Sequence, residues 1–398
     1  MIVDSDTVSR SAEEVEGFVP NSGRALAVER MLEDERLLLE RDGLSDLDFD
    51  EELAQAADST FGSKVPFWVK VTIACVVIVA FFVSFVLGKY AMTPIEVIEG
   101  VFNHLTGAIQ SLDDAKADRV LFSIRFPRIL VVMLVGAALS VAGASYQGMF
   151  RNPLTSPDLL GASAGASLGA CLALLLNMPG EMVQLFAFLG GMTAVGLAVA
   201  FNRVVDYDPT LGLVLAGILV STLFQSGTSL IKFMADANDK LPTITFWLMG
   251  SFAAIDVQDL LLALAPMALG FAILIFQSWK LNVLSFGDEE ARAMGVNTRR
   301  TRLLVIFAAT LITSVSVSVA GIVGWIGLVI PHLARAIVGP NYKVLLPTAM
   351  FIGATYLLLV DDIARLLAAV EIPIGILTAI LGVPFFVIIF RHNMKGWK

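Results

Sequence analysis

The chain contains ten apolar runs that are long enough, or nearly long enough, to cross the hydrocarbon core of a bilayer. A crossing helix needs about 20 predominantly apolar residues, and 57% of the 398 residues are hydrophobic while 16% are charged. The runs lie near residues 67–87, 129–149, 159–176, 182–201, 211–231, 260–279, 303–319, 323–338, 344–360 and 374–390. Because a backbone inside lipid has to satisfy its own hydrogen bonds, each run is predicted to be helical. The sequence therefore predicts an all-α polytopic membrane protein with about ten transmembrane helices.

The first 64 residues differ from the rest of the chain in charge. Residues 1–64 carry 17 acidic and 6 basic side chains, a net charge of −11, and lack the apolar core of a signal peptide. Low hydrophobicity combined with high net charge is typical of disorder. We therefore predict two parts: an acidic, disordered cytoplasmic extension at 1–64 and a transmembrane domain at 65–398.

The basic residues of the loops predict the orientation. If ten spans alternate, the loops that hold Arg151, Lys280 and Arg300 fall on one side of the membrane, and that side carries 14 Lys and Arg against 8 on the other. Basic loops are enriched on the cytoplasmic side. The sequence therefore predicts a multi-pass protein of the cytoplasmic (cell) membrane with both termini in the cytoplasm.

The apolar pattern breaks between the second and third runs, where "RNPLTSPDLLGASAGA" occupies residues 151–166. Proline is tolerated in a first helical turn, so Pro157 is predicted to begin the next helix, with Asp158 in that turn. Small residues let membrane helices approach closely, and irregular backbone at membrane depth has to be covered by protein or to line a water-filled path. The candidate gate and pathway residues at this break are Asn152, Pro153, Gly161 and Gly165.

A second break occupies residues 318–335, "SVAGIVGWIGLVIPHLAR", and repeats the "SVAG" of residues 140–143. An inverted repeat in a transporter would give two such copies, but four common membrane residues also match by chance, so both interpretations stay open. Pro331 and His332 are further candidate pathway residues, and His332 beside a proline is expected to cap backbone carbonyls.

The sequence contains no pattern for catalysis or for a metal site. The phosphate-binding motif G-x-x-x-x-G-K-[ST] does not occur, and His104, His332 and His392 are scattered without cysteine partners. Cys75 and Cys171 lie inside predicted spans and are expected to be small apolar residues. Most predicted spans lack Asp and Glu, which disfavours an intramembrane enzyme and a proton- or sodium-coupled carrier. The prediction is a non-enzymatic membrane path that binds no metal or cofactor and needs an external source of energy.

A polar loop at residues 281–302 indicates where that energy enters. A structured loop of this length is usually functional, and this one is expected to form two short helices around Gly295. Here the sequence resembles the FecCD-type permeases, the membrane subunits of ABC importers for iron–siderophore complexes, haem and cobalamin. The resemblance covers roughly residues 67–392. Its motifs are "RFPR", "RNPLTSPDLLGASAGA", "LAG", "FWLMGSF", "GDEEARAMGV", "GIVGWIGLVIPHLAR" and "EIPIGILTAILGVPFF".

The resemblance implies a type II ABC importer fold with re-entrant or broken helices. It also implies a homodimer or a heterodimer with a related permease, two separate ATPase subunits that use ATP and Mg, and an extracellular or periplasmic substrate-binding protein. Membrane lipid is an expected partner and nucleic acid is not. The expected function is import of an iron–siderophore complex, with haem or cobalamin import by the same fold, or a secondary transporter of another class, as alternatives.

The resemblance also assigns roles to residues. It implies an ATPase coupling loop at Gly287, Asp288, Glu289, Ala291, Gly295 and Val296. It implies that Arg125, Arg128 and Arg365 receive acidic residues of the binding protein. Thr210 lies where the family has a cytoplasmic gate, although the small polar residue that often follows it is Leu211 here.

Overall fold

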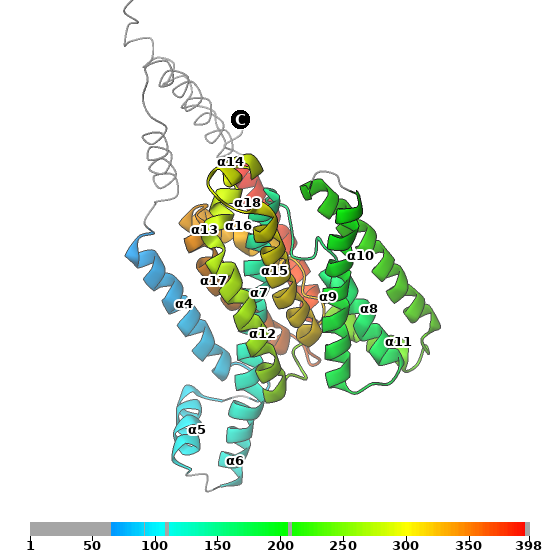
Figure 1. Cartoon of the computed structure of the whole chain (residues 1–398). Coiled ribbons are helices and arrows are strands. Elements are labelled where there is room, and N and C mark those ends of the chain that lie inside the picture. The colour runs from blue at the N-terminus through cyan, green and yellow to red at the C-terminus, as the bar shows by residue number, and fades with distance from the viewer. Residues whose placement is uncertain (1–64, 91, 108–110, 206–208, 395–398) are drawn as a thin grey trace, which may run out of the picture. The chain divides into compact units, whose positions relative to one another are not determined.

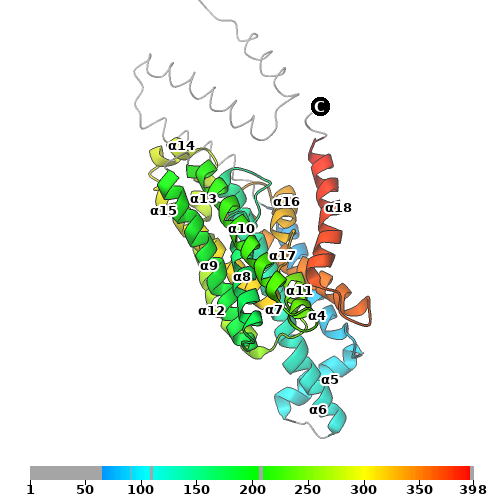
Figure 2. The same ribbon diagram turned by 90° about the vertical axis from the view of Figure 1, so that its right-hand side faces the viewer.

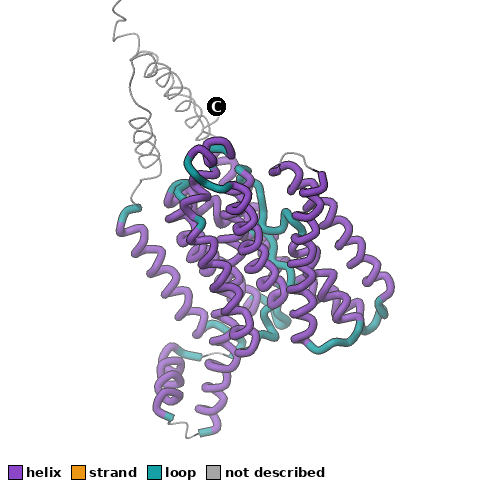
Figure 3. The backbone as a smooth tube through the Cα atoms, viewed as in Figure 1, coloured by secondary structure: helices purple, strands orange, loops and turns teal. Residues whose placement is uncertain are grey.

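The computed structural model describes residues 65–90, 92–107, 111–205 and 209–394, without the side chains of residues 204, 205, 209, 210 and 388–394. The predicted acidic extension, residues 1–64, lies outside the described residues. Residues 65–383 form one compact unit, to which the following description applies. Figure 3 shows helices and connecting loops, and no strand, in the part of the chain that is described.

The helices are labelled as in Figure 1. In chain order they are α4 (Phe67–Val86), α5 (Pro94–Thr106), α6 (Leu112–Asp118), the π-helix η1 (Arg119–Arg125), α7 (Phe126–Phe150), α8 (Ala162–Leu175), α9 (Gly180–Val205), α10 (Pro209–Met234), α11 (Lys240–Met249), α12 (Val257–Phe276), α13 (Ser278–Leu284), α14 (Asp288–Ala293), α15 (Thr298–Ala320), α16 (Ile326–Val338), α17 (Tyr342–Leu366) and α18 (Ile374–Met394). In Figure 1, α5 and α6 lie at one end of the bundle, and α13 and α14 lie at the other.

The predicted spans correspond to helices. Among the described residues, seven helices are long and apolar enough to cross a membrane, and three shorter apolar helices begin at Ala162, Ile326 and Ile374. The three short ones are the third, eighth and tenth predicted spans. Two of them, α8 and α16, follow the two breaks in the apolar pattern. The prediction of an all-α membrane protein with broken helices is therefore confirmed.

Helix α7 is the core of the unit. It continues η1 and α6 into a single helical stretch from Leu112 to Phe150, and it packs against α12, α15, α16 and α17. Nearly every α7 residue from Pro127 to Phe150 is buried. A helix that is apolar around its whole circumference has to be surrounded by other elements, which explains why the second predicted span carries no polar face.

Helices α8, α9 and α10 lie side by side (Figure 2). The small residues of α8 allow its backbone to touch that of α9: a Cβ atom at Gly165 would collide with the carbonyl oxygen of Gly190, and one at Gly190 would collide with the carbonyl oxygen of Gly165. Without a hydrophobic driving force between helices in lipid, such close packing supplies much of the association energy. The expectation that this helix lies inside the bundle is confirmed.

We predict that Gly165→Ala destabilises the protein by about 1–3 kcal/mol, the usual cost of forcing extra atoms into a packed core. Gly196→Ala, in α9, is the matched control, because a Cβ atom there would meet nothing within 4 Å. The control should be neutral or gain up to about 1 kcal/mol from the higher helix propensity of alanine. Thermal unfolding of both purified variants measures the difference. Equal stabilities would show that α8 and α9 are not in backbone contact.

Candidate functional site

The first break joins α7 to α8 by an irregular segment. Helix α7 ends at Phe150, and the next residue, Arg151, has a left-handed conformation with φ of 50°. The prediction that Pro157 begins the next helix is wrong, because α8 begins at Ala162 after Gly161, whose φ of 86° favours glycine. Asp158 nevertheless acts at this helix terminus, since its carboxylate accepts a hydrogen bond of 2.8 Å from the backbone N–H of Ser163.

The second break joins α15 to α16. Helix α15 ends at Ala320, Gly321 has a φ of 69°, and α16 begins at Ile326. The segment is held by backbone contacts: the N–H of Ser251 donates to the carbonyl of Ala320 over 2.9 Å. This hydrogen bond satisfies a carbonyl at the end of α15 that has no partner within the helix.

The two breaks contact each other. His332 Nε2 donates to the carbonyl oxygen of Pro153 over 2.9 Å, so its predicted role as a carbonyl cap is confirmed. A Cβ atom at Gly327 would collide with the ring of Pro157. The structure therefore brings together two segments that are about 170 residues apart in the sequence, as their numbers show.

The other candidate pathway residues are distributed around this contact. Asn152 is exposed, and its side chain accepts a hydrogen bond of 2.9 Å from the N–H of Leu154. Pro331 is buried inside α16. Gly161 lies against Ser221 of α10, close enough to leave little room for a side chain. Thr210 is in the first turn of α10 but its side chain lies outside the described residues, so the gate role of Thr210 and the inverted repeat stay predictions.

The predicted coupling loop is a small folded unit. Helices α13 and α14 enclose a core of Val283, Leu284, Ala291 and Val296, while Glu289 is exposed. The expectation of two short helices around Gly295 is wrong, because α13 and α14 both precede Gly295 and the residues after it enter the long helix α15. Gly287, with φ of 141°, and Gly295, with φ of 76°, bound α14 on its two sides.

Three hydrogen bonds anchor this loop to the membrane helices. Asp288 accepts a hydrogen bond of 2.6 Å from Arg302 of α15, and the Arg302 side chain is only 8% exposed. Asn282 of α13 donates to Asn341 over 2.9 Å and accepts from the N–H of Tyr342 over 2.7 Å, at the start of α17. The loop is therefore tied to the N-terminal ends of α15 and α17.

Helix α10 exposes a stripe of neutral polar side chains, which we call the α10 stripe: Thr222, Gln225, Ser226 and Ser229. The hydroxyl groups donate to the carbonyl four residues earlier in the same helix. The amide of Gln225 is costly to expose to hydrocarbon. At Gln225 this face of α10 therefore favours water or another protein surface.

Three arginines form a cluster with three carboxylates, here called the arginine cluster. Arg128 of α7 makes two hydrogen bonds to Asp361, of 3.1 and 2.8 Å, and two to Glu371, also of 3.1 and 2.8 Å. Arg365 pairs with Asp361 over 3.2 Å and contacts Asp362, which accepts from Ser84 of α4. The cluster as a whole is Arg125, Arg128, Arg365, Asp361, Asp362 and Glu371, with Ser84 as a neutral member.

Two of these arginines also cap the end of α4. Arg125 donates to the carbonyls of Phe85 and Tyr90, and Arg365 donates to the carbonyl of Leu87 over 3.3 Å. The last carbonyls of a helix lack partners within it and carry the negative end of its dipole. The positive charges satisfy both needs, so the cluster joins α4, α7, α17 and the connection before α18.

The three arginines that the resemblance assigns to docking are expected to lie at the surface, and this expectation is wrong. Arg125, Arg128 and Arg365 are 4%, 6% and 5% exposed, because carboxylates and carbonyls of the same chain surround them. Their role in receiving a binding protein stays a prediction. Sequence reasoning missed Asp361 and Glu371, although the spacing of Asp361 and Arg365, four residues apart on a helix, is a recognisable signal for an ion pair.

We predict that Asp361→Asn destabilises the protein by about 3–5 kcal/mol, because removing one partner of a buried pair leaves uncompensated charge. Glu371→Gln should cost less, since the Glu371 side chain is 22% exposed. Chemical or thermal unfolding of both variants gives the comparison. Equal losses would mean that Asp361 is not the centre of the cluster.

The pH dependence gives a second check on Glu371. Burial alone would raise the pKa of Glu371, but the hydrogen bonds and charge of Arg128, with Lys89 and Arg365, hold it below its ordinary value. A carboxylate with a lowered folded-state pKa stabilises the fold above its ordinary pKa, and this contribution is lost as the pH falls through the folded pKa. The stability difference between the native protein and Glu371→Gln should therefore shrink on acidification.

The breaks, the α10 stripe and the anchored loop belong to a domain of membrane-spanning helices, and comparison with known proteins shows the class of that domain. A solved inward-facing structure of a metal-chelate type ABC transporter matches with a TM-score of 0.72 and 36% identity, over 81% of this chain and 98% of that one. The protein is thus a permease subunit of an ABC importer, an integral protein of the cell membrane, and ATP hydrolysis belongs to a separate subunit. The chain belongs to the FecCD transport family, because the model of that family matches residues 76–392.

Two relatives show the range of substrates within this similarity. The molybdate import system permease protein MolB of Haemophilus influenzae is 41% identical over 283 residues, which are 71% of this chain and 84% of the relative. The "Probable iron chelatin transport system permease protein" of Helicobacter pylori is 38% identical over 273 residues, which are 68% of this chain and 82% of the relative. These similarities therefore show the family and the mode of transport, and relatives within the family carry different substrates.

Proposed function

We propose that this permease imports an iron-bearing chelate, a siderophore complex in particular. The similarity to a metal-chelate type transporter and to an iron chelatin permease supports this substrate class. Molybdate is the second candidate, because the relative with 41% identity bears that name. Haem and cobalamin remain alternative substrates, as the family resemblance implies. The alternative of a secondary transporter is excluded, because the chain belongs to an ABC transport family.

The single observation that carries the transport path is the α10 stripe. An exposed run of Thr222, Gln225, Ser226 and Ser229 on a helix with membrane-spanning length needs water or a second subunit beside it. In the proposed assembly a second permease, identical or related, faces this helix and leaves a polar path between the two subunits. The stripe has no charged member, so a large chelate would pass without being held by a fixed charge.

The remaining parts of the assembly follow from the same proposal. Two ATPase subunits, which use ATP and Mg, press on the exposed face of α14, and the anchors at Arg302 and Asn341 pass the movement to α15 and α17. A substrate-binding protein delivers the chelate at the opposite end. This chain itself binds no cofactor, and both of its termini lie on the cytoplasmic side.

Uptake by the reconstituted transporter tests the substrate. The permease, its ATPase and its binding protein are placed in liposomes and supplied with a radiolabelled ferric siderophore or with radiolabelled molybdate. We expect ATP-dependent accumulation of the siderophore. Accumulation of molybdate alone would overturn the proposed substrate but leave the permease assignment intact.

Asp288→Asn in the same assay tests coupling. Loss of a hydrogen bond between charged groups costs about 1.5–3 kcal/mol, so uptake per ATP hydrolysed should fall about tenfold or more while ATP hydrolysis continues. Glu181→Gln makes the same chemical change at an exposed position in the first turn of α9 and should have no effect. Unchanged uptake by Asp288→Asn would show that this anchor does not transmit force.

A thiol introduced into the α10 stripe tests the path. Gln225→Cys should react with a charged, membrane-impermeant thiol reagent in the assembled transporter, because a water-filled path admits the reagent. The native Cys75 on α4 is exposed on the surface of the chain and provides the internal control, since a thiol that faces lipid should not react. Protection of Gln225→Cys together with Cys75 would show that no water-filled path runs along α10 and would contradict the proposed path.

A further inference from the structure

A groove of about 290 Å³ lies between α9 and α15 and belongs to none of the features described above. Apolar side chains line it from both helices: Met192, Val195, Val199, Leu303, Ile306 and Phe307. The polar member at its base, Thr310, shares a hydrogen bond of 3.2 Å with Tyr146 of α7. The groove therefore offers an occupant a surface suited to hydrocarbon.

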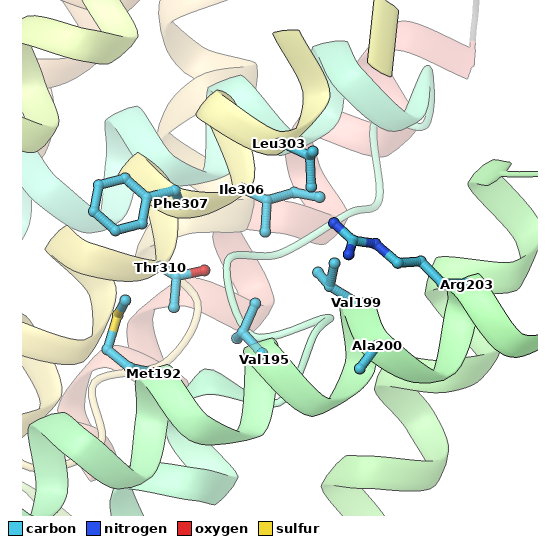
Figure 4. Close-up of a pocket in the computed structure, with 10 residues that line it drawn as sticks. Met192, Val195, Val199, Ala200, Arg203, Leu303, Ile306, Phe307 and Thr310 are labelled. Carbon is cyan, nitrogen blue, oxygen red and sulfur yellow. The ribbon is translucent and has the colours of Figure 1, made fainter. Parts of the chain in front are cut away.

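The groove has a basic mouth. Arg203 lines one end of it, and Figure 4 shows the Arg203 guanidinium extending from α9 toward Leu303 of α15. On α15, Arg299 and Arg300 precede Leu303 by four and three residues, which places them one turn beyond it on the same side of the helix. All three arginines are exposed. No ion pair to any of them occurs within the described part of the chain.

An apolar groove that ends at several guanidinium groups selects one class of ligand. A chelate or another polar solute has no favourable contact with the groove, and a neutral apolar molecule gains nothing from the arginines. A phospholipid with a net negative headgroup matches both parts: its acyl chain covers the apolar walls, and its phosphate accepts hydrogen bonds from the planar guanidinium groups. Basic pockets between transmembrane helices are known to select anionic lipids for this reason.

We propose that the groove between α9 and α15 is a binding site for an anionic phospholipid, with Arg203, Arg299 and Arg300 holding the headgroup. The site lies at the same end of the bundle as the coupling loop, because Arg302, the anchor of Asp288, follows Arg300 in α15. The inference does not depend on the proposed substrate or on the polar path along α10. It concerns a different face of α9 from the one that packs on α10 through Ala194 and Ala198.

Native mass spectrometry of the purified full-length protein tests the site, with phosphatidylglycerol and phosphatidylcholine of the same acyl chains as probes. We expect retention of phosphatidylglycerol over phosphatidylcholine. Arg203→Gln should reduce this preference about fivefold, the effect of about 1 kcal/mol for one basic residue at an anionic surface. Retention of the two lipids in equal amounts by the native protein would overturn the proposal.

Two further variants separate the groove from general surface charge. Gly196→Leu adds a side chain where a Cβ atom meets nothing within 4 Å, so it should fill the groove and displace phosphatidylglycerol without changing any charge. Lys343→Gln, at the exposed start of α17, removes a positive charge outside the groove and should leave the lipid preference unchanged. If Lys343→Gln lowers retention as much as Arg203→Gln, or if Gly196→Leu retains the lipid fully, the lipid is not held in this groove.

Discussion

In a bilayer, every backbone N–H and C=O has to find a partner within the protein, because hydrocarbon offers none. Most of this chain meets the requirement by being helical. The two breaks meet it in another way. His332 contacts the carbonyl of Pro153 and Ser251 the carbonyl of Ala320, and within the first break Asp158 accepts from the N–H of Ser163. The glycines and prolines that interrupt the apolar pattern are tolerated because the interruptions pack against each other.

The same constraint governs the charges at the end opposite the coupling loop. The three arginines are matched by three carboxylates. Arg125 and Arg365 also donate hydrogen bonds to the carbonyls at the end of α4. Removing charges from water is costly, and it is offset only when the geometry is good and the remaining hydrogen bonds are satisfied. The two pairs of parallel hydrogen bonds from Arg128 provide that geometry. The cluster therefore acts as a fixed joint between helices rather than as an exposed charged surface.

Helix α17 connects this joint to the coupling loop. Its first residue, Tyr342, and the preceding Asn341 hold α13, while Asp361, Asp362 and Arg365 near its other end belong to the arginine cluster. A continuous helix of 25 residues thus links the anchor of the loop with the far end of the bundle.

The sequence by itself determined the fold class, the ten apolar segments, the positions of both breaks and the polar loop at residues 281–302, because these depend on local composition and on motifs that are contiguous along the chain. It also indicated that His332 would cap a carbonyl and that the small residues of α8 would pack inside the bundle. Only the tertiary structure decided which carbonyl His332 meets, where α8 begins after Gly161, and that Arg125, Arg128 and Arg365 are buried against carboxylates and carbonyls. The reason is physical: an arginine near the end of a membrane helix is predicted to be exposed unless its partners are known. Glu371 and Asp361 are more than 230 residues from Arg128, a separation that only the folded chain closes.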